Sequence, residues 1–257
     1  MAKQWTLFPY PEKAYVYDAA ALKKHWARLH RGDCEPPPKS TAVLDAWRHY
    51  HAGDFAAAVD IGRTAGGAGI NAAVKAQMIY ANYLEKTEKV KLALLEEAAG
   101  WADERRQTAK DANAHYLYAY ALGRYSQGIS ITKALAQGMG GRVKDALTSA
   151  LELVPKHADA HIAFASYQAE IIDKVGAIVA SMTYGAKRDS ALEHFEQALK
   201  LNPESAIARI EFANGLIMMF GKSRMHEAEK LYKEAATCKP ADAMERLDVE
   251  LARSELE

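Results

Sequence analysis

The sequence predicts an all-α protein that is built from repeated pairs of helices. Three observations support this fold class. Fifty of the 257 residues are alanine, the residue with the highest helix propensity, and only 8 are proline. Apolar residues recur at i, i+3 and i+4 along almost the whole chain, and no stretch has the alternation that is typical of strands. One pattern of small and large residues also occurs three times, each time before a proline.

The repeated pattern ends at Pro155, Pro203 and Pro240. Small or short residues stand twelve and five positions before each proline, and a large apolar residue stands eight positions before it. The three columns are Val143, Ala191 and Ala228; Leu147, Phe195 and Tyr232; and Ala150, Ala198 and Ala235. Small side chains let neighbouring helices approach closely and the large one fills the gap, so each segment is predicted to be a packed helix that the proline ends.

These columns resemble the tetratricopeptide repeat, a unit of 34 residues with two antiparallel helices. Residues 191–203, ALEHFEQALKLNP, are close to the second helix of that repeat, and Gly123, Ala165 and Ala213 match the small eighth position of its first helix. The resemblance covers about residues 41–240. It implies a tetratricopeptide-like right-handed α-solenoid of four or five units and about twelve helices.

Residues 1–40 do not fit the repeat and are predicted to form an N-terminal helix with a proline-rich linker. Residues 15–30, YVYDAAALKKHWARLH, have the apolar spacing of one amphipathic helix. Residues 32–40, GDCEPPPKS, are typical of a stiff, polyproline-like connection to the array.

Residues 241–257 follow the array and are predicted to form a helix that caps it. Met244, Leu247 and Leu251 share one helical face amid many charged residues. A terminal helix of a solenoid needs one apolar stripe against the last repeat and a polar outer surface.

Two inserts interrupt the repeats. Successive prolines are 48 and 37 residues apart, more than one repeat length. The additional residues are assigned to 171–188 in the fourth unit, and a similar insert occupies 126–142 in the third. This layout resembles the T components of bacterial TRAP transporters and, more distantly, the regulators of microtubule dynamics, both atypical tetratricopeptide families.

Composition excludes several classes of protein. Lys plus Arg and Asp plus Glu both number 33, so the basic excess of a nucleic-acid-binding protein is absent. The longest apolar run, 215–220, is too short to cross a membrane, and Cys34 follows a polar run rather than a lipobox. The first residues contain no apolar run typical of a signal peptide, and the two cysteines form no CxxC pair. We therefore expect a cytoplasmic protein.

No motif predicts catalysis, a cofactor or a metal site. His157 and His161 share a helical face, as zinc ligands can, but no third ligand accompanies them, and capping or surface roles explain them. The glycines of GMGGRVK (138–144) resemble an anion nest but lack the spacing of a phosphate loop, so a turn into the next helix explains them. An enzyme with a site around residues 157–170 is the least favoured hypothesis.

The repeat itself indicates where a partner binds. In tetratricopeptide proteins, positions 2, 5, 9, 12 and 13 of each first helix face the concave groove. Transferred to this sequence, these positions are occupied by Tyr120, Arg124, Gln127, Asp159, Ser166, Glu170 and Asn214. Arg124 and Glu170 are the most informative, because charges on alanine-rich helices need solvent, each other or a partner.

Two functions follow from the resemblance. The first is a non-catalytic scaffold or adaptor that binds a protein or peptide on its concave face. The alternative is a small-ligand-binding protein whose pocket is closed by the inserts at 126–142 and 171–188, as the likeness to T components suggests. An open polar groove would favour the first function. An enclosed apolar pocket lined by insert residues such as Leu135, Ile178 and Met182 would favour the second.

Overall fold

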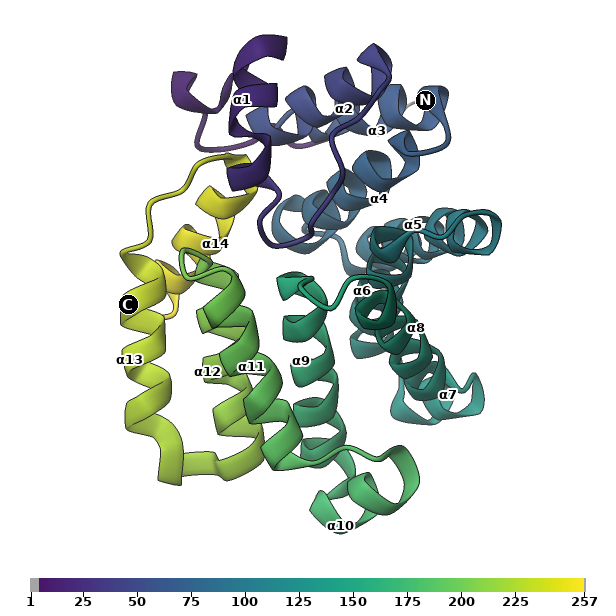
Figure 1. Cartoon of the computed structure of the whole chain (residues 1–257). Coiled ribbons are helices and arrows are strands. Elements are labelled where there is room, and N and C mark those ends of the chain that lie inside the picture. Colours follow the sequence, from purple (N-terminus) through teal and green to yellow (C-terminus); the bar gives the residue numbers. More distant parts are fainter. Residues whose placement is uncertain (1–4, 257) are drawn as a thin grey trace.

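The computed structural model describes residues 5–256 and consists, within that range, of helices and their connections (Figure 1). The α-helices are α1 (Ala19–Leu29), α2 (Thr41–Ala52), α3 (Phe55–Ala65), α4 (Gly69–Ile79), α5 (Glu88–Thr108), α6 (Ala112–Gln127), α7 (Ile131–Ala136), α8 (Met139–Leu153), α9 (Ala158–Val175), α10 (Ala177–Val179), α11 (Arg188–Leu201), α12 (Ala206–Phe220), α13 (Met225–Ala236) and α14 (Ala243–Ser254). Short 3₁₀ turns occupy Lys13–Tyr15 and Gly221–Arg224, and π-helical turns occupy Tyr80–Leu84 and Ala180–Tyr184.

The α-helices pack as five successive pairs, α2–α3, α4–α5, α6–α8, α9–α11 and α12–α13, and each pair also packs on the next. The all-α solenoid that the sequence predicts is therefore confirmed. Helices α7 and α10 belong to the two inserts, between the first and second helices of the third and fourth pairs. None of the helices within residues 5–256 has the length and apolar character that a membrane span requires.

The columns read from the sequence form the packed faces of the second helices. Ala150, Ala198 and Ala235 are all fully buried, and Phe195 on α11 is fully buried against residues of α9 and α12. The contact is close enough that a Cβ atom added to Gly215 would lie 2.5 Å from the Phe195 ring. Small residues at these positions are thus required by the distance between helices.

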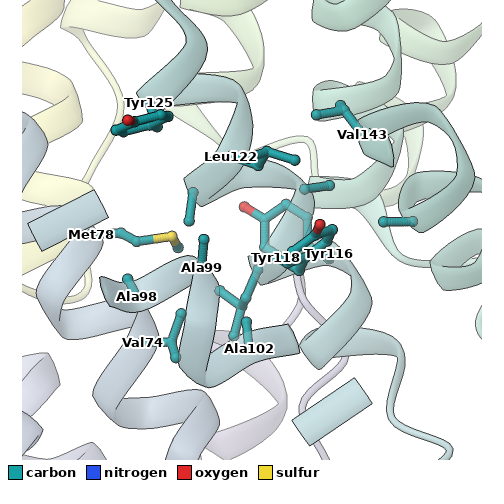
Figure 2. Close-up of a cluster of buried hydrophobic side chains, with 14 of the residues drawn as sticks. Val74, Met78, Ala98, Ala99, Ala102, Tyr116, Tyr118, Leu122, Tyr125 and Val143 are labelled. Atoms are coloured by element: carbon teal, nitrogen blue, oxygen red, sulfur yellow. The ribbon is translucent and has the colours of Figure 1, made fainter. Parts of the chain in front are cut away.

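The largest apolar cluster lies where α4, α5, α6 and α8 meet (Figure 2). Met78 comes from α4, Ala98 and Ala99 from α5, Tyr118 from α6 and Val143 from α8. Small residues on α5 let α4 and α6 approach it from both sides, which joins the second and third pairs into one core.

Helix α14 lies between the two ends of the array (Figure 1). Leu247 is buried against the N-terminal pairs, whereas Val249 and Ala252 are buried against the last pair. The predicted helix is present, but its expected single apolar stripe is wrong: α14 has two packed faces, and Met244 and Leu251 are only half-buried.

Polar contacts complete this closure of the array into a ring. Arg28 on α1 donates two hydrogen bonds to the carboxylate of Glu245 on α14, at 2.6 and 2.9 Å. His51 Nδ1 on α2 lies 2.6 Å from Asp242 Oδ2, and both side chains are buried. A bidentate arginine–carboxylate pair fixes geometry as well as charge, so the ends of the array are held in one register.

The segment after α1, which the sequence predicts to be a stiff linker, also contributes buried charged side chains. Asp33 and Glu35 are buried, and the carbonyl oxygen of Gly32 accepts a hydrogen bond from the Asp159 N–H on α9 at 3.0 Å. Charged groups can be buried when they have partners, and Asp33 has Lys75 as its partner. The predicted N-terminal helix is also shorter, because Asp18 caps α1 by accepting from the Ala21 N–H.

Candidate ligand-binding cavity

A cavity of about 400 Å³ lies inside the ring and is lined by the first helices of the second to fifth pairs together with α8 and α14. Its walls are mainly apolar, and the polar groups on them come from a few tyrosine and charged side chains. Pockets of this kind, with apolar walls and few polar groups, are typical small-molecule sites.

Six of the seven residues selected from the sequence line this cavity: Tyr120, Arg124, Gln127, Asp159, Ser166 and Glu170. The seventh, Asn214, lines an adjoining hollow that it shares with Tyr120, Arg124 and Gln127, and it accepts a hydrogen bond from the Tyr232 hydroxyl at 2.5 Å. The structure therefore brings the selected side chains together. Their role in binding stays a prediction.

Arg124 pairs with Glu211 on α12 rather than with Glu170. One guanidinium N–H donates to Glu211 Oε1 at 2.5 Å, and Ser166 donates to the other carboxylate oxygen at 3.1 Å. The guanidinium lies 5.4 Å from the centre of the Tyr120 ring. Burial opposes the charge of Arg124, but the Glu211 carboxylate outweighs it and raises the pKa of Arg124 well above its usual value.

Glu170 belongs to the outer rim of the cavity. It accepts a hydrogen bond from Gln127, and Lys174 lies 3.7 Å from its carboxylate. Burial raises the pKa of Glu170. Gln127 and Lys174 are exposed, so this rim is where the cavity meets solvent.

A buried ionic cluster closes the N-terminal side of the ring. Lys75 on α4 donates to Asp33 at 2.5 Å and lies 3.7 Å from Asp159. Asp33 also lies 3.0 Å from His30 Nδ1. Burial alone would raise the pKa of Asp33, but Lys75 and His30 hold it well below its usual value. Burial raises the pKa of Asp159 to about 6, because its distance from Lys75 leaves it less well compensated.

Glu35 continues this cluster toward α4 and α6. Its carboxylate accepts hydrogen bonds from the side-chain amides of Asn113, at 2.6 Å, and Asn71, at 3.0 Å. Burial and the nearby charges of Asp33 and Asp111 raise the pKa of Glu35 to about 8. The carboxyl group is thus surrounded by amides rather than by cations.

The two histidines with zinc-like spacing have other roles. His157 caps α9: its Nδ1 accepts from the Ala160 N–H at 3.0 Å, and its Nε2 lies 2.9 Å from the Asn113 side-chain oxygen. His161 contacts His194 and the Pro155 carbonyl oxygen. The capping explanation of His157 is confirmed. Across residues 5–256, no group of three or more His, Cys, Asp or Glu side chains is arranged to hold a metal ion.

Both inserts reach the cavity, but not through the residues expected. Ile178 and Met182 are 77 % and 83 % exposed, so the prediction that they line the pocket is wrong, and the Leu135 side chain lies outside the described part of the structure. Gly176, at φ +78°, precedes α10, and Tyr184 at the other end of the insert lines the cavity in place of the apolar residues expected.

The insert residues that line the cavity are Ser126, Gln127, Ile129, Ala134, Met139 and Gly140 from the first insert and Ile171, Lys174, Val175 and Tyr184 from the second. Lys144 in the second turn of α8 donates to the Tyr184 carbonyl oxygen at 2.8 Å and links α8 to the second insert. Gly138 precedes α8 in the left-handed conformation, which confirms a turn into that helix.

Sequence reasoning did not select Glu211, Lys75, Tyr83, Tyr116 or Asp248, although all of them line the cavity. Glu211 could have been found from its helix, because it lies three residues before Asn214 and so on the same face. Asp248 lies outside the repeats, and no repeat position predicts where it packs.

Residues 71–256 match the family described as regulator of microtubule dynamics protein 1-3. The chain belongs to this family. From the sequence alone, the T components of TRAP transporters are the nearer resemblance and these regulators the more distant one. The family match shows that the regulators are the chain's own family. A search of curated proteins finds no significant match.

The fold of this family member is similar to that of TTC0263, a thermophilic tetratricopeptide repeat protein from Thermus thermophilus. The two chains are 17 % identical, with a TM-score of 0.56 over 83 % of this chain and 97 % of the other. At this identity the likeness concerns the fold alone, and it supports a tetratricopeptide-like solenoid.

Proposed function

We propose that this regulator-family protein is non-catalytic and binds a small, mostly apolar ligand inside the ring. The observation that carries the proposal is the cavity of about 400 Å³, whose walls include residues from both inserts and from α14. Burying apolar surface supplies binding free energy of roughly 25 cal/mol for each Å² removed from water. The expected cytoplasmic location stays a prediction.

Closure of the ring supports a small ligand over an extended one. Helix α14 and the segment at Gly32–Glu35 occupy part of the inner surface that an extended peptide would use in an open solenoid. The remaining space is bounded on several sides, and such preformed pockets bury most of the surface of a small ligand.

Nile red, a neutral apolar dye, tests the proposal. We expect saturable binding to the full chain and a loss of at least tenfold in affinity for Ala163→Phe, which fills the cavity from α9. Ala93→Phe, at an exposed position of α5, is the matched control and should bind as the parent does. Absence of saturable binding, or equal binding by a folded Ala163→Phe, would contradict the proposal.

A protein or peptide partner is the second candidate, because the tetratricopeptide-like fold and the polar rim beside the cavity both favour it. Arg124→Glu tests it against any partner recovered from cells, with Lys200→Glu on the outer surface as control. A desolvated contact should lose about 2–5 kcal/mol in titration calorimetry. Equal affinities of parent and both variants would exclude this surface.

A further inference from the structure

One end of the cavity carries carboxyl groups with too few cations. Asp248 on α14 is 2 % exposed and lines the cavity, and within residues 5–256 its one hydrogen bond comes from the Tyr83 hydroxyl at 2.5 Å. Asp159 lines the same space, but Lys75 is 3.7 Å away from it and is held at 2.5 Å by Asp33. Acidic groups therefore outnumber cations at this end of the cavity.

The other cations of the cavity already have partners. Arg124 pairs with Glu211 at 2.5 Å, and Lys174 at the rim lies 3.7 Å from Glu170. Asp248 forms no ion pair within the part of the chain that the structure describes. A buried carboxylate without a cation is costly, and a ligand that supplied the cation would remove that cost.

The surroundings of Asp248 agree with this reading. Burial, together with the negative charges of Glu245, Asp242 and Asp159, raises the pKa of Asp248 well above its usual value, against the effect of the Tyr83 hydrogen bond. A cation beside the carboxyl group would act in the opposite direction and favour its ionised form.

Tyrosines surround the same space. Tyr83, Tyr116 and Tyr120 all line the cavity, and the rings of Tyr116 and Tyr120 are parallel to within 2°, with centres 6.0 Å apart. Tyr116 is 8 % exposed, and its hydroxyl forms no hydrogen bond with residues 5–256. Aromatic faces attract ammonium groups, and a free hydroxyl accepts a hydrogen bond from one.

Resting on the proposed cavity ligand, we infer that this ligand carries an organic ammonium group, which Asp248 and Asp159 bind beside Tyr116 while its apolar part extends between the two inserts. The opposite end of the cavity supports this orientation, because Ile129 and Val175 from the inserts line it. Coulomb attraction and the tyrosine faces would bind the ammonium head group, and burial of apolar surface would bind the apolar part of the ligand.

Three ten-carbon probes test the inference. Decylammonium, decanol and decanoate share the same ten-carbon alkyl chain and differ in head-group charge. Each is titrated, below its critical micelle concentration, to displace Nile red from the full-length protein at pH 7.4. We expect decylammonium to bind at least tenfold more tightly than decanol, and decanoate to bind more weakly than decanol. In Asp248→Asn the preference for decylammonium should fall below threefold while decanol binds as before. Asp145→Asn, at an exposed position, should keep the preference.

The outcomes separate the two proposals. If none of the probes displaces Nile red, the cavity ligand itself is refuted and the ammonium inference falls with it. Decanol that binds as tightly as decylammonium would overturn the ammonium inference alone, as would an unchanged preference in a folded Asp248→Asn. Should that variant fail to fold, the ratio of affinities in the parent chain decides.

Discussion

The two sides of the inner surface of the ring differ in what occupies the space between the helices. On the N-terminal side, Asp33 and Glu35 from the segment after α1 fill the space between α4, α6 and α9 with hydrogen-bonded charges. On the insert side, Ile129 and Val175 border a cavity that the chain does not fill. The same helix-pair repeat therefore surrounds a filled, polar interior on one side of the ring and an unfilled, apolar cavity on the other.

This difference teaches that the concave face of a solenoid has no fixed role. Where the chain supplies its own charged segment, changes to side chains should affect stability. Where it leaves a cavity, similar changes should affect binding and leave stability nearly the same. The following predictions compare the two sides directly.

Removing the lysine of the filled side should have the largest effect. Lys75→Met leaves Asp33 and Asp159 buried without a cation, which should lower the free energy of unfolding by about 3–5 kcal/mol. Lys174→Met, at the cavity rim, should change it by less than about 0.5 kcal/mol. Urea denaturation measures both, and equal midpoints would mean that the two sides do not differ.

The filled side should also make stability depend on pH. The pKa of Glu35 is about 8 when folded and near 4.5 when unfolded, so the folded state is progressively disfavoured as the pH rises between these values. Glu35→Gln removes this dependence and keeps an acceptor for Asn113. Between pH 4.5 and pH 8, the free energy of unfolding of the variant should rise by about 3 kcal/mol relative to that of the parent.

His30 and His157, whose pKa values burial lowers to about 4, cause a loss of stability below pH 6.5 in both chains, so their effect cancels in this comparison. Urea midpoints at pH 5, 6, 7 and 8 give the difference between parent and variant. A difference that stays constant across these values would refute the prediction.

Packing should separate the core of the repeats from the wall of the cavity. Ala198 is fully buried against Ile162 and Ala208, so Ala198→Leu should cost about 1–3 kcal/mol through overpacking. Ala163→Leu adds the same atoms toward the cavity and should cost about 0.5 kcal/mol or less. Thermal melts of both variants provide the test, and a stable Ala198→Leu would show that the repeat register is wrong.

The smallest effect is expected at Gly123, in the cavity wall on α6. A Cβ atom there would meet no atom of another part of the chain within 4 Å, and alanine favours a helix over glycine, so Gly123→Ala should stabilise the fold by about 0.5–1 kcal/mol. Gly62→Ala on the N-terminal side should lose stability, because its Cβ would lie 2.6 Å from the Gly69 carbonyl oxygen. If the melting temperatures of Gly123→Ala and Gly62→Ala shift in the same direction, the predicted difference between the two sides is wrong.

Periodicity and spacing predicted the helices and the packed columns, and the resemblance to the tetratricopeptide repeat predicted the common position of Arg124, Ser166 and Glu170. They did so because these features repeat locally, within one unit or between neighbours. Sequence reasoning could not assign Glu211 to Arg124, since several carboxylates lie within reach of a groove position. It also missed the burial of Asp33, because its partner Lys75 is 42 residues away and no local pattern relates them.

The orientation of the second insert was wrong for a different reason. Its apolar residues, Ile178 and Met182, suggested a pocket lid, but they are exposed, and the segment that carries them is bounded by two glycines with positive φ, Gly176 and Gly185. Hydrophobicity identifies what a segment can bury, and the backbone conformation determines what it does bury.

Closure of the ring also has a consequence for folding. The Arg28–Glu245 pair joins residues 217 positions apart, so loop-closure entropy opposes its formation more than that of contacts between neighbouring repeats. During synthesis, Arg28 and His51 leave the ribosome long before Glu245 and Asp242. We therefore expect docking of α14 to be a late and slow step, after which the array has no free end from which a single pair can unfold alone.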